Sequence, residues 1–437
     1  MASEGLLMEF AALSQSIGAE LLAFSSRAAS GFSSVSIDSR TAKEGSLFVA
    51  LSGSASDGHR HIGGAFRAGA DAAMVESAKL ASSGAAAIAK DMGKTLIVVD
   101  NTLRGLQDSA RVYLEQFPGL LKIGITGSSG KTTAKEITAA IIGVEKNTVM
   151  NPGNYNSETG LPLAVFAVRP WHEAGVFELG MNRNGEIGEL AAVLKPNIAL
   201  ITNIGSAHIG ILGSKQAIAE EKKQIFSQLG AGAALIPEDD EFRDFLAQGS
   251  GGRVCFYGPK SFTELGAIKD LGLGGSEITW DGQRIRFPLP GKHNLADALA
   301  ALAIAREIPV SRGAIKRGLE SARPLVGRGE IIRGRTTVIR DCYNANPESL
   351  GEALDFCDSL EWAGRRVYVI GDMLELGAAS CFAHQEMGRR LAASRADMVF
   401  LYGTETEAAA ALMAGKPYFH TRRMEELSAA LDGYVQK

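Results

Sequence analysis

The chain alternates short apolar runs with segments whose apolar residues recur at helical spacing, a pattern typical of α/β proteins. In the first part, strand-like runs lie at 46–51, 72–75 and 96–99, and residues 62–69 predict a helix between the first two. Glycine and serine are frequent from 53 to 58, which predicts a turn there. The alternation continues to about residue 105, where we expect a first region to end.

The second part of the chain, roughly 106 to 322, alternates in the same way, but its strands are almost entirely apolar. Such strands are buried on both faces, so this pattern predicts a parallel sheet with helices on both faces. Ligands of these sheets bind at the carboxyl ends of the strands. The predicted strands are 123–125, 175–178, 198–202, 233–236 and 254–257.

A β-hairpin interrupts this alternation between residues 277 and 290. Two strand-like runs, Ile278–Trp280 and Arg284–Phe287, flank the pair Asp281-Gly282. An Asp-Gly pair between two strands favours a primed two-residue turn.

The α/β pattern resumes after Arg323-Pro324, a plausible boundary because the residue before proline is disfavoured in a helix. Strands are predicted there at 337–339, 366–370 and 398–401. We therefore predict an α/β protein with a central P-loop parallel sheet and a C-terminal α/β domain of nucleotide-binding type. The three predicted domains are 1–105, 106–322 and 323–437.

Composition narrows the class of protein. The 437 residues include 45 basic and 49 acidic ones, so the net charge of −4 gives no strong field for nucleic acid or membrane. The four cysteines form no C-x-x-C pair and suit reduced thiols. Met1–Gly5 lacks the basic start of a signal peptide, and no apolar run reaches membrane-spanning length. We expect a cytoplasmic protein without membrane insertion.

The most informative segment is Ile123–Thr133, an apolar run followed by a glycine-rich turn and a helix-forming segment. Glycines let main-chain N–H groups converge on a phosphate, while Lys131 adds a positive charge and the Thr132 hydroxyl can bind Mg²⁺. The common form of this loop has glycine in place of Ile125, so a structural turn is the alternative; the flanking strand and helix favour ATP or GTP. The predicted phosphate-binding residues are Gly127, Ser128, Ser129, Gly130, Lys131, Thr132 and Thr133.

Polar residues follow other strands of this predicted sheet. Glu178 ends one strand, where it can bind Mg²⁺ beside the phosphates or simply be a solvated strand end. His208 follows another strand, but a lone histidine is more often a surface or packed residue, so its position does not decide. Asn151–Gly160 is dense in turn formers and predicts a loop, functional or not.

Together these segments resemble the Mur ligase family of peptidoglycan synthesis over nearly the whole chain. Several spaced motifs in one order are more specific than any single loop. The motifs are Thr126–Thr132, Gly153–Asn156, Glu178–Met181, Thr202–His208, Gly291–Asn294 and Asp341–Pro347, with Asp38–Arg40, Gly45–Ala50 and Gly371–Gly377 outside the central region.

The resemblance implies a role for each matching residue. Lys131 would hold the ATP phosphates and act in catalysis, Thr132 and Glu178 would bind one Mg²⁺, and His208 would bind a second. Lys222 matches the lysine that these ligases carbamylate, which turns a cation into a carboxylate-like metal ligand. Without the resemblance, Lys222 would be a solvated lysine on a charged helix.

Further residues would bind the nucleotide. The resemblance implies that Asn294 contacts the nucleotide and that Arg328 contacts the γ-phosphate. It implies that Asp341 contacts the ribose, while Tyr343 and Asn346 lie in the segment that borders the adenine.

The implied reaction joins UDP-N-acetylmuramoyl-tripeptide and D-alanyl-D-alanine through an acyl phosphate, at the expense of ATP and with two Mg²⁺ ions. Domain 1–105 would bind the UDP substrate and domain 323–437 the dipeptide acceptor. A monomer that binds no nucleic acid is expected. The alternatives are an amide ligase of the Mur or folylpolyglutamate type with another acceptor, and a nucleotide-binding regulator without ligation.

Three departures from family patterns and one match refine this expectation. Many family members have threonine at Asn151 and an acidic residue at Gln224, so the acceptor loop and the Lys222 helix are in doubt in detail. The Asp-Asn-Pro-Arg string expected of the enzyme that adds the third residue is absent, whereas Gly371–Gly377 matches the dipeptide-adding members.

Overall fold

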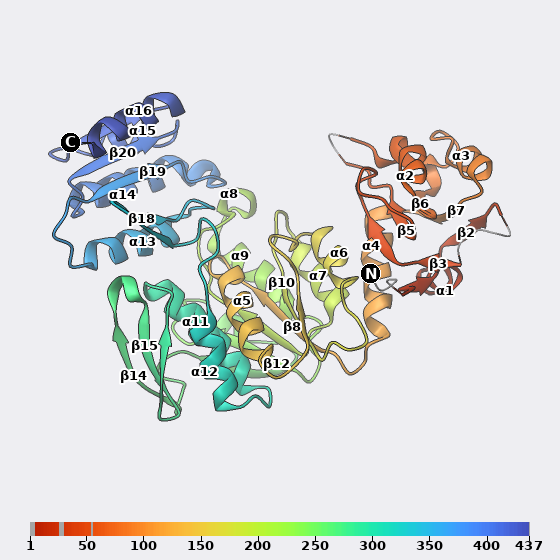
Figure 1. Ribbon diagram of the computed structural model, residues 1–437, viewed down its shortest axis with the longest axis horizontal. Helices are drawn as coiled ribbons and strands as arrows, with labels where there is room; N and C mark the ends of the chain where they lie inside the picture. Colours follow the sequence, from red (N-terminus) through yellow and green to blue (C-terminus); the bar gives the residue numbers. More distant parts are fainter. Residues whose placement is uncertain (1–4, 26–29, 54–55, 437) are drawn as a thin grey trace. The chain divides into compact units, whose positions relative to one another are not determined.

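The computed structural model describes residues 5–25, 30–53 and 56–436 (Figure 1). Contacts between residues divide the chain into two compact units. The expectation for Met1–Glu4 and the middle of the predicted turn at 53–58 lie outside the described residues. Unit 1 comprises Met1–Gly124, Lys146–Met181 and Glu186–Asn197. Unit 2 comprises Ile125–Glu145, Asn182–Gly185 and Ile198–Lys437.

Unit 1 contains a five-stranded sheet in the order β2-β7-β6-β5-β4. The predicted strands are confirmed and pair in parallel, whereas β2 is an unpredicted antiparallel strand at the edge. Phe48, Phe66 and Val75 belong to its apolar core. The strands are β2 (Glu20–Ala23), β4 (Ser34–Ser36), β5 (Ser46–Val49), β6 (Ala72–Glu76) and β7 (Thr95–Val99), with a separate pair β1 (Met8–Glu9) and β3 (Gly31–Phe32).

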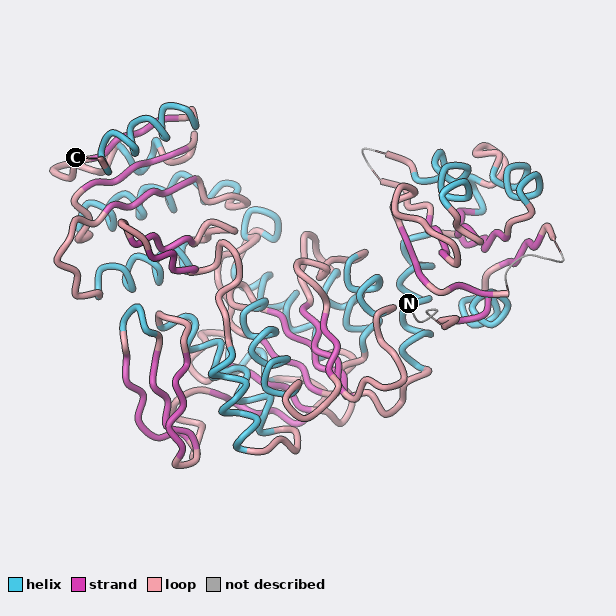
Figure 2. The backbone as a smooth tube through the Cα atoms, viewed as in Figure 1, coloured by secondary structure: helices cyan, strands magenta, loops and turns pink. Residues whose placement is uncertain are grey.

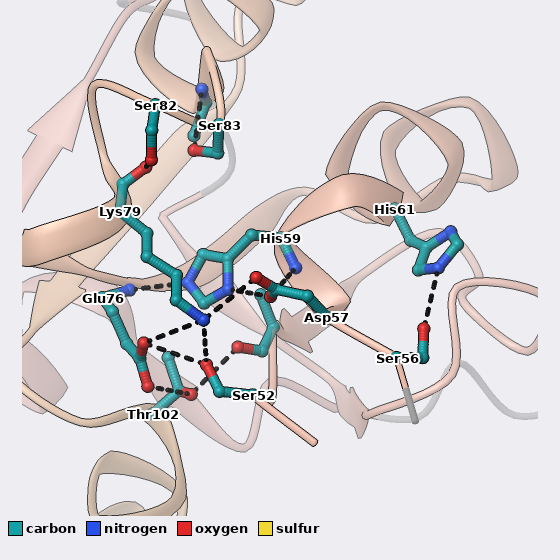
Figure 3. Close-up of polar contacts among 12 residues, drawn as sticks. Ser52, Ser56, Asp57, His59, His61, Glu76, Lys79, Ser82, Ser83 and Thr102 are labelled. Carbon is teal, nitrogen blue, oxygen red and sulfur yellow. Dashed lines mark hydrogen bonds and ion pairs between the residues drawn. The ribbon is translucent and has the colours of Figure 1, made fainter. Parts of the chain in front are cut away.

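Helices and a polar cluster complete the N-terminal part of unit 1. The predicted helix at 62–69 is confirmed as α2. The carboxyl ends of β5 and β6 lead into the unit 1 polar cluster, defined as Ser52, Asp57, His59, Glu76, Lys79 and Thr102 (Figure 3). The helices are α1 (Phe10–Ile17), α2 (Ile62–Ala68), α3 (Ala85–Met92), α4 (Thr102–Glu115), α6 (Gly160–Val165) and α7 (Glu186–Leu194).

A six-stranded parallel sheet has the order β13-β12-β11-β8-β10-β9, and its middle strand β8 crosses the boundary between the two units. Main-chain bonds from Asn197 to Lys122 and from Thr202 to Thr126 set β11 beside β8. The predicted parallel sheet is confirmed, with one unpredicted edge strand, β9. The strands are β8 (Leu121–Thr126), β9 (Thr148–Met150), β10 (Ala174–Glu178), β11 (Ile198–Ile201), β12 (Ala233–Pro237) and β13 (Arg253–Tyr257).

Helices of unit 2 pack against its part of this sheet (Figure 2). Helix α11 packs on β11, β12 and β13 and also contacts α5 and α12. Helix α10 packs on β12 and contacts α9. The helices are α5 (Lys131–Ile142), α8 (Ile209–Leu212), α9 (Lys215–Lys223), α10 (Arg243–Ala247), α11 (Lys292–Arg306) and α12 (Arg312–Ser321).

The predicted hairpin is confirmed in unit 2. Asp281 and Gly282 have φ values of 48° and 75°, as a primed turn requires, and Trp280 pairs with Gln283 across it. The hairpin belongs to an antiparallel sheet of β14 (Leu265–Asp270), β15 (Ser276–Trp280) and β16 (Gln283–Phe287), of which β14 was not predicted.

The C-terminal part of unit 2 repeats the α/β pattern, as predicted. Leu391, Val399 and Leu401 lie in its apolar core. Its strands are β17 (Glu330–Arg333), β18 (Thr337–Arg340), β19 (Val367–Gly371), β20 (Met398–Tyr402) and β21 (Tyr418–Thr421), and its helices are α13 (Pro347–Ser359), α14 (Ser380–Ala393), α15 (Glu407–Ala410) and α16 (Met424–Val435). Within the described residues, no helix combines the length and the apolar character needed to cross a membrane.

Candidate active site

The phosphate-binding loop joins β8 to α5 and depends on two glycines. Gly127 has a φ of 153°, and a Cβ there would lie 1.8 Å from Thr202 Oγ1. Gly130 has a φ of 78°, and a Cβ would lie 2.0 Å from Asp297 Oδ1. A larger residue at either place would clash with the Thr202 or Asp297 side chain and would have to adopt a positive φ, so glycine is favoured at both positions.

Two lysine side chains converge on this loop from different helices. Lys131, the first residue of α5, donates from Nζ to Gly127 O at 2.9 Å. Lys222, near the end of α9 and 1% exposed, also donates to Gly127 O at 2.9 Å. The two ammonium groups therefore share one carbonyl and place positive charge at the loop, which favours an anionic ligand.

The segment after β11 braces the same loop. Thr202 donates from Oγ1 to Ser129 O at 2.5 Å, and Asn203 Oδ1 accepts from Ser129 N at 3.0 Å. Thr132 is buried and Thr133 half-buried in the first turn of α5. The helix starts at Gly130, which provides no side-chain cap among the described residues, so the N-terminus of α5 is suited to an anion.

Asp297 is a buried carboxyl group beside this loop that the sequence analysis missed. It lies on α11 against Gly130, and burial raises its pKa well above the usual 3.8, although Arg328 and Lys131 lower it. Its spacing of three residues from Asn294 places both on one helix face, a signal that could have drawn attention to it.

Glu178 belongs to unit 1 and is held there by two asparagines. Asn151 is fully buried; its side chain donates to Glu178 O at 3.0 Å and accepts from Glu178 N at 2.9 Å. Asn156 donates to Glu178 Oε1 at 2.7 Å. The other oxygen, Oε2, is buried and has no hydrogen-bond partner among the described residues, which fits a cation ligand. Asn151 thus fixes the Glu178 backbone and Asn156 its carboxylate, roles that the sequence did not reveal.

His208 lies between α8 and the strand β11, with a left-handed φ of 65°. Its Nδ1 atom is 2.7 Å from Oε2 of Glu375, which also has a positive φ, of 62°. The two atoms are close enough for an ion pair, but the angles do not suit a hydrogen bond. Burial and then the charge of Lys222 lower the pKa of His208, while Glu375 opposes them. The imidazole is therefore neutral near pH 7, the form that binds metals.

The predicted nucleotide contacts gather around the turn at Gly327–Gly329. The guanidinium of Arg328 lies over the Tyr343 ring, 3.9 Å from its centroid, and Asp341 Oδ1 accepts from Gly329 N at 3.2 Å. A Cβ at Gly329 would lie 3.8 Å from Asn294 Nδ2, so Asn294 borders the same turn.

Asn346, the last of the predicted nucleotide-binding residues, contacts the phosphate loop. Asn346 Nδ2 donates to Ser129 Oγ at 3.1 Å. Unit 2 therefore holds all predicted site residues except Glu178, and it brings the phosphate loop, Lys222 and Asn346 into contact.

A divalent cation fits part of this donor set. In the described part of the chain, no three His, Cys, Asp or Glu side chains gather closely enough to form a metal centre by themselves. Taken separately, Glu178 Oε2 in unit 1 and the Thr132 hydroxyl in unit 2 are oxygen donors of the kind that Mg²⁺ prefers, and the neutral His208 imidazole can bind a divalent metal through nitrogen. Lys222 could join them only after its ammonium group is modified, because a cation does not bind a metal.

A parallel sheet, a glycine-rich loop and the start of a helix define the class of P-loop nucleotide-binding proteins. Three family models match the chain: the Mur ligase family catalytic domain at residues 32–113, the Mur ligase middle domain at 125–305 and the Mur ligase glutamate ligase domain at 327–437. The chain belongs to the Mur ligase family, and it is a ligase.

Individual relatives agree with this assignment. The chain is 43% identical to the UDP-N-acetylmuramoyl-tripeptide–D-alanyl-D-alanine ligase of Treponema pallidum over 92% of its own length and 88% of the relative's. Its fold is similar to that of MurF from Acinetobacter baumannii, with a TM-score of 0.86 at 29% identity over 97% and 91% of the two chains. It is also similar to MurF from Thermotoga maritima in complex with ADP, with a TM-score of 0.76 at 26% identity over 92% and 91%.

Proposed function

We propose that this protein joins D-alanyl-D-alanine to UDP-N-acetylmuramoyl-tripeptide, converting ATP to ADP and phosphate, in the cytoplasmic synthesis of peptidoglycan precursors. One observation carries the proposal: the glycine loop with Lys131 and Lys222 on the Gly127 carbonyl, in a chain 43% identical to a ligase of that name. The ADP bound to a MurF of similar fold supports ATP as the nucleotide.

The residues of unit 2 would hold the nucleotide. Lys131 and the start of α5 bind the phosphates, Arg328 reaches the γ-phosphate, and Asp341 binds the ribose. Tyr343 and Asn294 lie at the same turn and contact the rest of the nucleotide. The charge and orientation of these groups position ATP without any covalent bond to the protein.

One Mg²⁺ ion would be held by Thr132 and Glu178, and a second by His208 together with a carbamylated Lys222. Their charge would offset the repulsion between a substrate carboxylate and the triphosphate. The position of Lys222 supports this role, because the side chain is 1% exposed and its Nζ atom lies at the phosphate loop, 2.9 Å from Gly127 O.

The chemistry proceeds in two displacements. The terminal carboxylate of the tripeptide attacks the γ-phosphorus, and ADP leaves, which creates an acyl phosphate. The amine of D-alanyl-D-alanine then attacks the acyl carbon, loses a proton and expels phosphate. The protein orients the reactants and excludes water, so no enzyme nucleophile is needed.

The three predicted domains would divide this work. Region 1–105 would bind the UDP substrate, region 106–322 ATP, and region 323–437 the dipeptide. The separate family matches at 32–113, 125–305 and 327–437 support this division. We propose a monomer, because the chain itself supplies every residue named above.

The test is ADP release by the purified protein with Mg·ATP and UDP-N-acetylmuramoyl-tripeptide, with and without D-alanyl-D-alanine. Dipeptide-dependent ADP and a product heavier by the added dipeptide support the proposal. ATP binding without turnover for any third residue of the peptide would contradict it, and turnover with another amino acid would indicate a different amide ligase.

A further inference from the structure

The first turn of α13 contacts the segment that follows β11. Glu348, the second residue of the helix, accepts from Ser206 N at 3.1 Å through Oε1 and from Ser206 Oγ at 2.6 Å through Oε2. Asn346, the N-cap of the helix, donates to Ser129 Oγ in the phosphate loop. One helix end therefore contacts both the loop and the segment beside it.

Ser206 is connected to the phosphate loop through its neighbour in the chain, Gly205. Its neighbour Gly205 donates from N to Ser128 Oγ at 2.8 Å, and Ser128 Oγ donates to Gly205 O at 3.3 Å. A Cβ at Gly205 would lie 3.2 Å from Glu348 Cδ and 3.3 Å from Ser128 Cβ. Gly205 thus lies close to both the carboxylate and the loop, and it connects the position of Glu348 with the backbone that Ser128 contacts.

The carboxylate is held in place as an anion. It lies in the first turn of α13, where the helix dipole favours negative charge, and Lys215 Nζ is 3.4 Å from Oε1. Burial raises the pKa of Glu348, but the hydrogen bonds from Ser206 and the charge of Lys215 together lower it by more, so the net shift is downward. Two charge-assisted hydrogen bonds to one serine are stronger than neutral ones and fix its backbone.

We propose that Glu348 is a positioning residue for nucleotide binding, which acts through Ser206 and Gly205 on the shape of the phosphate loop. The proposal rests on the proposed function, in which this loop binds ATP. It adds that a carboxylate of the C-terminal segment, 220 residues away from Ser128 in the chain, sets the affinity of the nucleotide site.

A loss of this carboxylate is compatible with folding. The Glu348 side chain is 40% exposed and borders, with Ser206, a cavity of about 670 Å³, so water can replace it. Glu386 lines the same cavity from α14 and is 51% exposed, with an ion pair to Arg389. Glu386→Gln is therefore a matched control that removes a charge from the same cavity without a contact to Ser206.

The experiment measures the Kd of Mg·ADP by calorimetry, and KM for ATP and kcat, for the full-length protein and its variants. In Glu348→Ala we expect a Kd and a KM for ATP about tenfold higher, with kcat and the melting temperature little changed. Glu348→Gln should lose less, because its amide oxygen still accepts one bond, and Glu386→Gln should match the wild type.

A double-mutant cycle identifies the route. If Glu348 acts through Ser206, then Ser206→Ala combined with Glu348→Ala should weaken ADP binding by no more than about twofold beyond Glu348→Ala alone. Additive losses, or an unchanged ADP affinity in folded Glu348→Ala, would overturn the proposal. A wild type that binds ADP but ligates nothing would contradict the proposed function alone, and a wild type that does not bind ADP would contradict both.

Discussion

Parallel strands in two sheets of this protein end in polar residues, but the two sets of polar residues differ in how their charges are used. In unit 1, His59 Nδ1 lies 2.7 Å from Asp57 Oδ1, His59 Nε2 accepts from Glu76 N at 2.9 Å, and Lys79 donates to Asp57 Oδ2 at 3.0 Å (Figure 3). In unit 2, Lys131 and Lys222 turn two positive charges to one carbonyl beside an uncapped helix start.

The difference shows that position at a strand end does not by itself make a binding site. The charged members of the unit 1 polar cluster find their partners within it: Lys79 pairs with both Asp57 and Glu76, and the other members hydrogen-bond to one another. At the phosphate loop, Lys131 and Lys222 instead both donate to the Gly127 carbonyl, beside the N-terminus of α5. A cluster whose polar groups satisfy one another stabilises the fold, whereas ammonium groups and a helix N-terminus that meet at one glycine-rich loop favour an anionic ligand.

The sharpest test of this comparison is Lys131→Ala. We expect the ligation rate to fall by about 10²–10³-fold, because the substitution removes a positive charge that would stabilise the phosphates in the transition state. The melting temperature should change little, since the loop geometry depends on Gly127 and Gly130. Lys260→Ala, which removes a 79% exposed lysine, is the control. A folded Lys131→Ala protein with full activity would remove Lys131 from the site.

Lys222→Ala probes the second charge at the same loop. We expect activity to fall by about 10²-fold and to recover in part with added bicarbonate or short carboxylates, because these can replace a carbamate as metal ligand. Rates measured with increasing formate, with chloride as the ionic-strength control, give the answer. An active variant, or an inactive one that no carboxylate restores, speaks against a carbamylated Lys222.

In unit 1 we expect a mutation to lower the stability of the fold and to leave nucleotide binding unchanged. His59 is 2% exposed, so His59→Ala removes a buried hydrogen-bond acceptor from Glu76 N and leaves space behind, at a cost of about 2–4 kcal/mol of unfolding free energy. Urea unfolding measures this loss. His61→Ala, in the same short helix but exposed, should cost little. The ADP affinity should stay unchanged; a large loss of ADP affinity with unaltered stability would reverse the comparison.

The sequence predicted the elements better than the contacts, for physical reasons. Apolar runs such as Ile198–Ile201 identify buried strands by themselves, and Asp281-Gly282 requires a primed turn, so both predictions are confirmed. The sequence analysis missed the edge strands β2, β9 and β14, which are short and mostly half-buried or exposed and so lack the fully buried pattern of a central strand.

The site was predictable where main-chain geometry demands one residue type. Gly127 and Gly130 can be recognised because no side chain fits, but the partner of a polar residue depends on tertiary packing. Asn151 on the Glu178 backbone and Glu375 on His208 are such cases, since each pair is far apart in the chain. The roles in catalysis and metal binding remain proposals that the variants above test.

The smallest expected effect is the pH dependence of Asp57→Asn in the unit 1 polar cluster. The hydrogen bond from Lys79, despite burial, lowers the pKa of Asp57 in the folded protein. A lowered pKa contributes stability that is present above the unfolded-state pKa of about 3.9 and is lost as the pH falls towards the folded-state pKa. The difference from wild type at neutral pH should be about 1 kcal/mol, because the carboxylate is 29% exposed and partly screened.

Urea unfolding of wild type and Asp57→Asn at neutral pH and at about pH 3 measures this difference, which should narrow at the lower pH because the wild-type protein binds a proton only on unfolding. Asp91→Asn, at an exposed position on α3, should show no such narrowing. A difference that stays constant with pH would mean that the shape of Asp57, and not its charge, stabilises the cluster. The carboxylate whose charge stabilises the cluster would then be that of Glu76. The pKa of Glu76 is also lowered, because the hydrogen bond from Ser52 and the charge of Lys79 outweigh burial.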